Sequence, residues 1–369
     1  MAFYLCVTMS STLLALIAQL WKEGRCLAGN GENPLKKPDR TVFVMLAVFS
    51  LVPYCLTMGL RYGIGTDYFF TYVPAFQKAA NGTFTLEIGF QWLMRLVLLF
   101  TDDPTGLFLV CAVVIVGMTG KAIWECSELP WVSILLFAAD RHFFMSMNGM
   151  RQYMSLAVVL GAFKYVREKC LWKYVLVVLA ASLFHTSVLI FLPLGLLMYL
   201  KINPVVGGGL VVILSLLRVP LTNVIRWAVS HTRFARYYIE SGWLVESPYT
   251  HKFYFLLILT IMASIFYSKN KDDVGYQFLY SLELIVLYLS VNRSIVILAD
   301  RLCWSLEFFH LLLIPKIIVS SDSKLVRWIV GIICVGACLI FCVYEIFHYG
   351  YHEVYPYQSI FSIPQMGLV

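Results

Sequence analysis

Long apolar runs recur along most of this chain. Many are about 17–25 residues long, the length that a helix needs to cross the hydrocarbon core of a bilayer. Strands of a membrane barrel would instead alternate apolar and polar residues in short segments. The 369 residues are 60% hydrophobic and only 13% charged, unlike soluble domains of this size. We therefore predict an all-α, polytopic integral membrane protein with a single transmembrane domain over residues 1–369.

The basic residues indicate a topology. Loops such as Trp21–Arg40 and Lys164–Lys173 are rich in lysine and arginine, and such loops are normally cytoplasmic. Lys22 follows the first apolar run, so this run is expected to be a retained span rather than a cleaved signal peptide. The pattern predicts about 12 spans (range about 11–14) with both termini outside. Most arginines then lie at the outer face or within apolar helices.

The expected spans are Met1–Leu20, Thr41–Leu60, Thr105–Ile123, Leu129–Met147, Gly149–Val166, Leu171–Phe184, Thr186–Leu200, Pro204–Leu217, His251–Tyr267, Val274–Leu289, Ser294–Ile318 and Leu325–Ile346. Residues 61–101 mix polar and aromatic side chains, and we expect them to form interfacial or re-entrant helices at the outer face. The alternative is that Phe84–Phe100 is a true span. Residues 218–250 are expected to form an outer polar loop.

Arginines flanked by apolar residues are the main candidate site residues. Arg141, Arg151 and Arg301 either reach the interface, pair with a local acid, or hold an anionic ligand. A guanidinium keeps its charge and matches phosphate oxygens with a planar fork of donors. Asp67 and His185, predicted on the same face, could accept a proton from an attacking hydroxyl. Their structural alternatives are a helix cap for Asp67 and a helix-turn hydrogen bond for His185.

Several other functions have little support in the sequence. The net charge of +7 is dispersed through membrane loops, so we expect no nucleic-acid partner. The ten cysteines include no Cys-x-x-Cys pair, and Cys334, Cys338 and Cys342 recur at helical spacing typical of packing. Gly207-Gly208-Gly209 lacks the Lys-Ser/Thr of a phosphate loop. We therefore expect no metal and no cofactor.

An aromatic stretch at 226–249 has two interpretations. It contains Arg236, Tyr237 and several tryptophans and tyrosines. Such residues form interfacial belts in membrane proteins, but aromatic faces also stack on sugar rings. We include Arg236 and Tyr237 among the candidate substrate-binding residues.

Short motifs along most of the chain resemble the EpsG family of Wzy-like bacterial exopolysaccharide and O-antigen polymerases. They are, in chain order, Gly65-Thr66-Asp67-Tyr68 with Tyr72, Glu87-Ile88-Gly89-Phe90, Asn148-Gly149-Met150-Arg151-Gln152-Tyr153-Met154, Leu183-Phe184-His185-Thr186-Ser187, Arg301, and Tyr355-Pro356-Tyr357.

The resemblance implies a membrane glycosyltransferase at the outer, periplasmic face of the bacterial inner membrane. It would polymerise undecaprenyl-pyrophosphate-linked oligosaccharide repeats without a metal. Asp67, Arg151, His185 and Arg301 match the family positions that we expect to be catalytic. The expected substrate-binding residues are Gln152, Tyr68, Tyr72, Glu87, Arg236, Tyr237 and Arg141. The expected partners are the lipid-linked oligosaccharide, the bilayer, and flippase and chain-length regulator proteins.

Three other functions fit the same residues. A lipid-linked glycan flippase or transporter would bind pyrophosphate with these arginines and break no bond. A membrane O-acyltransferase would use His185 to transfer an acyl group onto polysaccharide. A structural subunit of an export complex would have no activity of its own.

Overall fold

The computed structural model describes residues 1–24, 39–217, 223, 227, 230–231, 250–291 and 297–362. Within these ranges the chain is helical and contains no strand beyond an isolated bridge between Arg61 and Ser359. The predicted all-α class is therefore confirmed. Two compact units are distinguished by their internal contacts: unit 1 is Met1–Lys164, Trp172–Leu192 and Cys342–Val369, and unit 2 is Tyr165–Leu171 and Pro193–Phe341.

Five described helices are long and apolar enough to cross a membrane. They are Ala2–Lys22, Arg40–Gly59, Pro104–Cys126, Val274–Val291 and Lys324–His348. Each coincides with a predicted span. A sixth is reached if the bent pair Arg301–Glu307 and His310–Val319 is one span. Six shorter apolar helices of 10–17 residues accompany them, so a membrane protein is supported while the expected number of about 12 spans is not confirmed.

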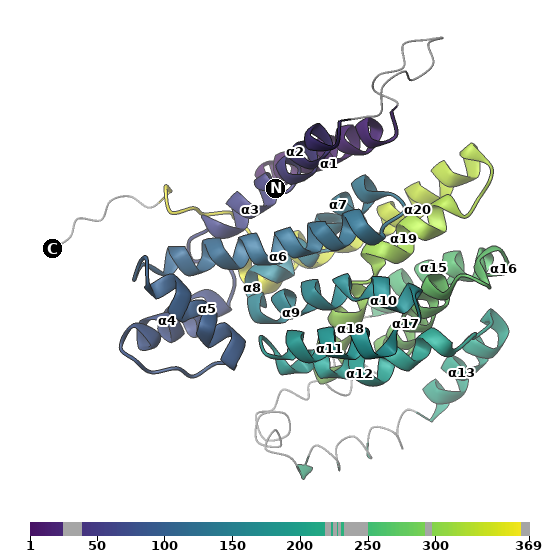
Figure 1. Ribbon diagram of the computed structural model, residues 1–369. Coiled ribbons are helices and arrows are strands. Elements are labelled where there is room, and N and C mark those ends of the chain that lie inside the picture. Colours follow the sequence, from purple (N-terminus) through teal and green to yellow (C-terminus); the bar gives the residue numbers. More distant parts are fainter. Residues whose placement is uncertain are drawn as a thin grey trace. The chain divides into compact units, whose positions relative to one another are not determined.

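Unit 1 is built around the long helix α6 (Pro104–Cys126), which packs against α3 (Val52–Gly59) and α9 (Met150–Gly161) (Figure 1). Asp103 begins α6 by accepting a hydrogen bond from the backbone N–H of Thr105, with proline at the first helical position. Helix α1 (Ala2–Lys22) lies against α2 (Arg40–Phe49), α3 and α7 (Pro130–Ala139).

The expected span Leu129–Met147 is not one continuous helix. The structure divides it into α7 and α8 (His142–Asn148), with Asp140 and Arg141 between them. Arg141 has the left-handed φ of 68°, which ends the first helix. Its buried side chain pairs with two carboxylates, and these contacts hold the unusual backbone in place. The apolar pattern alone could not reveal this break.

The segment 61–101 folds into three short helices beside α6: η1 (Tyr68–Tyr72), α4 (Val73–Ala80) and α5 (Ile88–Leu98). In Figure 1 they form a separate group next to the beginning of α6. An 11-residue helix such as α5 extends ~16 Å, well short of the ~30 Å hydrocarbon core. This length favours the interfacial or re-entrant interpretation over a span at Phe84–Phe100.

The predicted span Leu171–Phe184 corresponds to α11 (Leu171–Ser182). After a turn at His185, the chain continues as η2 (Thr186–Ile190), α12 (Phe191–Leu194) and η3 (Gly195–Tyr199). The second expected span, Thr186–Leu200, is thus a series of short helical pieces rather than a regular helix. Helix α10 (Phe163–Arg167) precedes α11.

Unit 2 is centred on α17 (Val274–Val291). The helices α13 (Pro204–Leu216), α15 (Thr250–Ile265), α18 (Ile297–Glu307) and α19 (His310–Val319) all contact it. Helices α18 and α19 are bent by 43° at their junction. The remaining helices are α16 (Tyr267–Asn270) and α20 (Lys324–Cys342), followed in unit 1 by η6 (Val343–His348) and η7 (Tyr351–Glu353).

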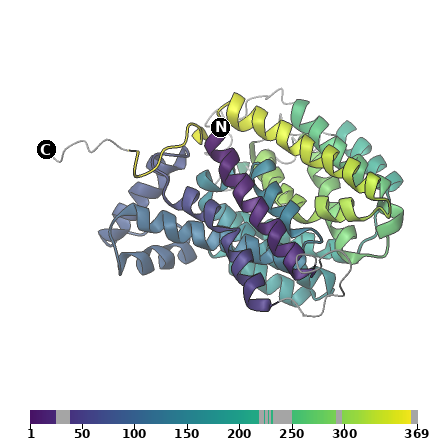
Figure 2. The same ribbon diagram turned by 90° about the horizontal axis from the view of Figure 1, so that it is seen from above.

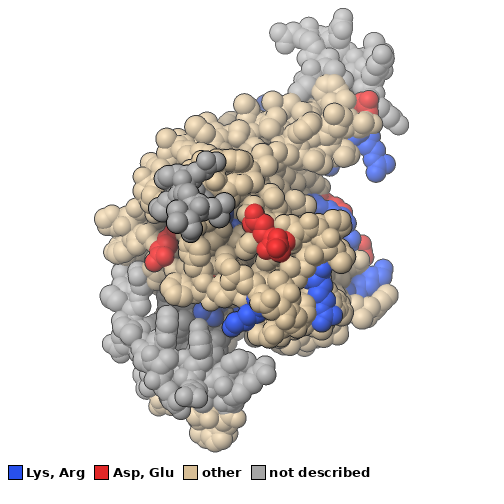
Figure 3. Space-filling model, turned by 90° about the vertical axis from the view of Figure 1, so that its left-hand side faces the viewer, with Lys and Arg blue, Asp and Glu red and all other residues tan. Residues whose placement is uncertain are grey.

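The face drawn in Figure 3 is largely uncharged where it is described. The face in Figure 3 carries only scattered lysine, arginine, aspartate and glutamate side chains among uncharged residues. Large apolar side chains are exposed along several helices, for example Val205 and Leu216 on α13 and Ile340 on α20. Exposed apolar surface of this extent is expected where helices face lipid.

Candidate functional site

Two family-like motifs meet where α5 begins. The backbone N–H of Gly89 donates to the carbonyl oxygen of Leu183 over 2.8 Å, so the start of α5 contacts the turn that carries His185. A Cβ atom at Gly89 would lie 2.8 Å from that oxygen, a distance that real Cβ atoms essentially never show. Only glycine permits this approach. The contact brings Glu87, the residue before α5, close to His185.

Glu87 bridges Arg151 and His185. One carboxylate oxygen, Oε1, lies 2.8 Å from Nδ1 of His185, and the other, Oε2, forms an ion pair with Nη1 of Arg151. The three side chains are half-buried, with exposed fractions of 18% for Glu87, 20% for Arg151 and 24% for His185. We call these residues the Glu87 cluster. Each comes from a different motif of the sequence.

The electrostatics of the Glu87 cluster determine which nitrogen of His185 carries a proton. Burial opposes ionisation of Glu87, but the hydrogen bond from His185 and the charge of Arg151 outweigh it and lower the pKa to about 2. An ionised carboxylate can only accept hydrogen bonds, so Nδ1 of His185 must carry a proton. In neutral His185 the lone pair is therefore on Nε2, and this nitrogen can act as a base.

Arg151 is held by more than its ion pair. The buried Tyr72 hydroxyl interacts with the guanidinium beside Glu87. The Nε atom of Arg151 is buried and makes no hydrogen bond to any described residue. Arg151 thus keeps donor capacity in addition to the contacts that orient it. Gln152 is its half-buried neighbour on α9.

Asp67 lies in a loop held against the end of α8. Asn148 accepts hydrogen bonds of 2.8 Å from the Asp67 backbone N–H and from the Thr66 hydroxyl. Gly65 makes this approach possible: its φ is +91°, and a Cβ there would lie 3.1 Å from the carbonyl oxygen of Met147. The Asp67 carboxylate is half-buried and accepts a hydrogen bond of 3.1 Å from Thr71.

Tyr68 and Tyr72 are core residues in this structure. Both are nearly fully buried, and Tyr68 stacks on Phe108 with ring centroids 4.3 Å apart. The buried Arg61 guanidinium lies over the same Phe108 ring and donates to the Met147 carbonyl oxygen over 2.9 Å. These contacts support the loop that carries Asp67. The predicted substrate-binding role of the two tyrosines stays a prediction.

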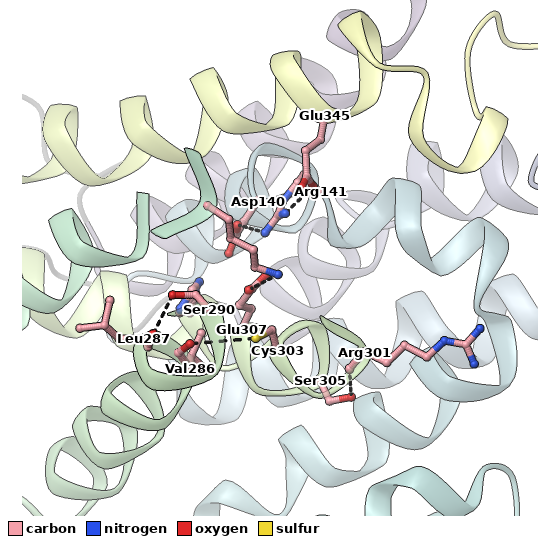
Figure 4. A network of polar contacts seen from close by, with 12 residues as sticks. Asp140, Arg141, Val286, Leu287, Ser290, Arg301, Cys303, Ser305, Glu307 and Glu345 are labelled. Carbon is pink, nitrogen blue, oxygen red and sulfur yellow. Dashed lines mark hydrogen bonds and ion pairs between the residues drawn. The ribbon is translucent and has the colours of Figure 1, made fainter. Parts of the chain in front are cut away.

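Arg141, one of the predicted substrate-binding residues, is fully buried in unit 1. Its guanidinium pairs with Glu345 at 2.5 Å and with Asp140 at 3.5 Å (Figure 4). Asp140 also lies 3.3 Å from Nε2 of His142, whose Nδ1 is 3.1 Å from the Tyr153 hydroxyl. The guanidinium therefore contributes to a buried network that joins α8, α9 and η6. Its predicted contact with substrate stays a prediction.

Arg301 belongs to α18 of unit 2. Figure 4 shows its side chain extending away from Glu307 on the same helix. Glu307 pairs at 2.7 Å with Lys252, and both residues are fully buried. A shared site of Arg301 with Arg151 remains a prediction.

Unit 2 also contains a buried histidine–carboxylate contact that sequence reasoning missed. His310, the first residue of α19, lies 2.8 Å from Glu283 through Nε2 and Oε2. The other oxygen of Glu283 accepts a hydrogen bond of 3.0 Å from Thr260. An acid in the middle of an apolar run is itself a signal of a buried partner. The sequence could not identify that partner.

Two predicted substrate-binding residues, Arg236 and Tyr237, and most of the loop 218–250 lie outside the described residues. Within the described ranges, no three His, Cys, Asp or Glu side chains are grouped so as to hold a metal ion. The expectation of metal-independent chemistry therefore still requires an experiment.

Comparison with known proteins addresses the family. Residues 44–359 match the family model described as "EpsG family". Comparison with curated proteins and with solved structures gave no match. The matched range includes every member of the Glu87 cluster, the Asp67 loop, Arg301 and the Tyr355-Pro356-Tyr357 segment. Because the match covers most of its length, the chain belongs to the EpsG family.

Proposed function

We propose that this protein polymerises polysaccharide by transferring a growing glycan from a polyprenyl pyrophosphate to a hydroxyl of the next lipid-linked repeat. Membership of the EpsG family supports a membrane polysaccharide polymerase in general terms. The observation that carries the more specific proposal is the Glu87 cluster, in which one carboxylate orients both a cation and a histidine.

In the proposed step, Nε2 of His185 takes the proton from the acceptor hydroxyl. The hydroxyl oxygen forms a bond to the anomeric carbon, and the bond from that carbon to the pyrophosphate oxygen breaks. The polyprenyl pyrophosphate leaves with the electron pair, and Arg151 stabilises the negative charge that develops on it. Ionised Glu87 keeps His185 in the required tautomer and stabilises the imidazolium that forms.

Asp67 and Arg301 have supporting roles in this proposal. Asp67 would accept a hydrogen bond from the acceptor sugar, since its carboxylate is partly exposed and its loop is tied to α8. His185 is preferred over Asp67 as the base because Glu87 fixes its tautomer. Arg301 would be a second ligand of the pyrophosphate. We further propose that the reaction takes place at the periplasmic face of the bacterial inner membrane, with an undecaprenyl carrier.

Purified protein in vesicles with a defined lipid-linked repeat tests this function. We expect a ladder of longer glycans with the wild type and a loss of ~10²-fold or more in correctly inserted Arg151→Ala and His185→Ala proteins. Movement of the repeat across the bilayer without elongation would identify a flippase instead. Acyl transfer that requires an acyl donor would identify an O-acyltransferase. A wild-type ladder that Arg151→Ala and Arg301→Ala leave unchanged would refute the proposed arginine roles.

A further inference from the structure

The segment after η6 packs along the chain that leads to Asp67. The carbonyl oxygen of Gln358 accepts from Tyr62 N–H over 3.0 Å, and the N–H of Ile360 donates to Leu60 over 3.0 Å. Glu353 accepts from Gly65 N–H over 3.3 Å, two residues before Asp67. Figure 2 shows this segment near the N-terminus, where the Tyr4 hydroxyl donates to Val354. We call residues 351–360 the C-terminal strap.

Asn148 joins the strap to the Asp67 loop. Its Oδ1 accepts from the Asp67 backbone N–H and the Thr66 hydroxyl, each over 2.8 Å, and its Nδ2 lies 2.9 Å from Nδ1 of His352. These three contacts account for most of the hydrogen bonds that one amide side chain can form. Asn148 is also the last residue of α8, three positions before Arg151.

The Asp67 backbone N–H determines which atoms of Asn148 and His352 donate hydrogen bonds and which accept them. A backbone N–H can only donate, so the Asn148 atom facing Asp67 must be the oxygen. The atom facing His352 is then the Nδ2 amide, which can only donate. Nδ1 of His352 must therefore accept, and a side chain that replaces His352 can preserve the contact only if it offers an acceptor.

The strap adopts a costly backbone at this point. His352 and Glu353 both lie in the left-handed region, with φ of 64° and 51°. Residues other than glycine adopt this region rarely and keep it only where the surrounding contacts demand it. Here His352 contacts Asn148, and Glu353 accepts a hydrogen bond from Gly65. Gly65 belongs to the loop that carries Asp67, and Asn148 holds that loop in place.

We propose that Asn148 is a positioning residue for Asp67 and that His352 is its acceptor partner, so the C-terminal strap is part of the active site. The proposal rests on the proposed polymerase function and adds two residues that act through others: Asn148 sets the Asp67 loop against the start of α9, and His352 fixes the Asn148 amide. Neither residue needs to touch the reacting atoms.

A matched pair of substitutions at position 352 isolates the acceptor. His352→Gln offers the Oε1 acceptor and His352→Leu offers none, while both pay a similar backbone cost at positive φ. We expect elongation to fall at least tenfold in His352→Leu, and His352→Gln to recover most of that loss. Asn148→Leu should lower kcat at least as much as His352→Leu, with a smaller change in KM. His348→Leu, on the exposed end of η6, is the matched control and should elongate like the wild type.

Coupling and exchange measurements separate positioning from simple destabilisation. The double variant Asn148→Leu/His352→Leu should be no slower than Asn148→Leu alone, because the two residues act as one unit. Amide exchange of the peptide containing Asp67 should accelerate in His352→Leu and return toward wild type in His352→Gln. Equal losses in the Gln and Leu variants, or fully additive effects, would overturn this proposal while the wild-type ladder still supported the function. Absence of that ladder would refute the proposed function itself, and the exchange result would then decide the positioning role alone.

Discussion

The most informative single change is Glu87→Gln, which keeps the shape of the side chain and removes its charge. The lowering of the Glu87 pKa from 4.5 to about 2 corresponds to ~3 kcal/mol of preferential stabilisation of the ionised form. The carboxylate is 18% exposed, and solvent screening reduces that figure. We therefore expect the variant to lose ~1–2 kcal/mol of stability at neutral pH.

The sign of the pH dependence is fixed by the direction of the shift. A depressed carboxyl pKa stabilises the folded state fully above the ordinary value of 4.5, and the contribution is lost as pH falls toward about 2. The part of the difference in unfolding midpoint between wild type and Glu87→Gln that arises from ionisation of the carboxyl should be present in full from pH 8 to about pH 5.5. Below that it should shrink steadily, because Glu87 becomes protonated in the unfolded wild type while it stays ionised in the folded protein, so folding must then remove a proton.

Thermal unfolding of the detergent-purified proteins across this pH series measures the effect. Glu125→Gln is the matched control in the same unit, because Glu125 is 40% exposed and its nearest lysine nitrogen is 3.7 Å away. Such a surface pair should contribute less than ~0.5 kcal/mol. A Glu87→Gln protein as stable as the wild type at pH 7, or a difference that persists unchanged to pH 3, would refute the reasoning.

Two further predictions concern packing and buried charge. Gly89→Ala should shift the start of α5 away from Leu183, because the added Cβ would meet a backbone oxygen at 2.8 Å. We expect a loss of ~1–3 kcal/mol of stability and reduced elongation. Unfolding midpoints measure the first effect and ladder assays measure the second. Lys252→Met should destabilise unit 2 by ~3–5 kcal/mol by leaving buried Glu307 without its counter-ion, and Lys252→Met/Glu307→Leu should recover most of it. An unaltered midpoint in Lys252→Met would contradict the second prediction.

The parts of the fold that depend on apolar length were predictable. Helices α1, α6 and α17 coincide with expected spans because an uninterrupted apolar run in lipid has few alternatives to a helix. The break between α7 and α8 was not predictable. It depends on Arg141 pairing with Glu345, 204 positions later in the chain, and no local pattern reports such a pair.

The candidate site was likewise predictable only in part. The sequence identified Asp67, Arg151 and His185, but it left open which groups they contact. It placed Glu87 among the substrate-binding residues, whereas the structure places this carboxylate between Arg151 and His185. That arrangement depends on Gly89 approaching Leu183, a three-dimensional contact between segments about 94 positions apart.

Asn148 and His352 were missed for a related reason. Asn148 lies inside a motif that the sequence singled out, but an asparagine before a helix is normally a local cap. His352 carries no signal of its own, because its left-handed backbone and its contact with Asn148 appear only in the folded chain. The side-chain pairs that complete the candidate site are therefore long-range, and long-range pairs are what a single sequence conceals.

We propose that the Glu87 cluster cleaves a sugar–pyrophosphate bond each time it forms a glycosidic bond. The direct measurement counts both products, free polyprenyl pyrophosphate and new glycosidic bonds, made by purified protein in vesicles from one lipid-linked repeat. We predict a one-to-one ratio for the wild type and a parallel fall in both products for Arg151→Gln. Glycan elongation without release of the lipid pyrophosphate, or undiminished turnover in Arg151→Gln, would contradict it.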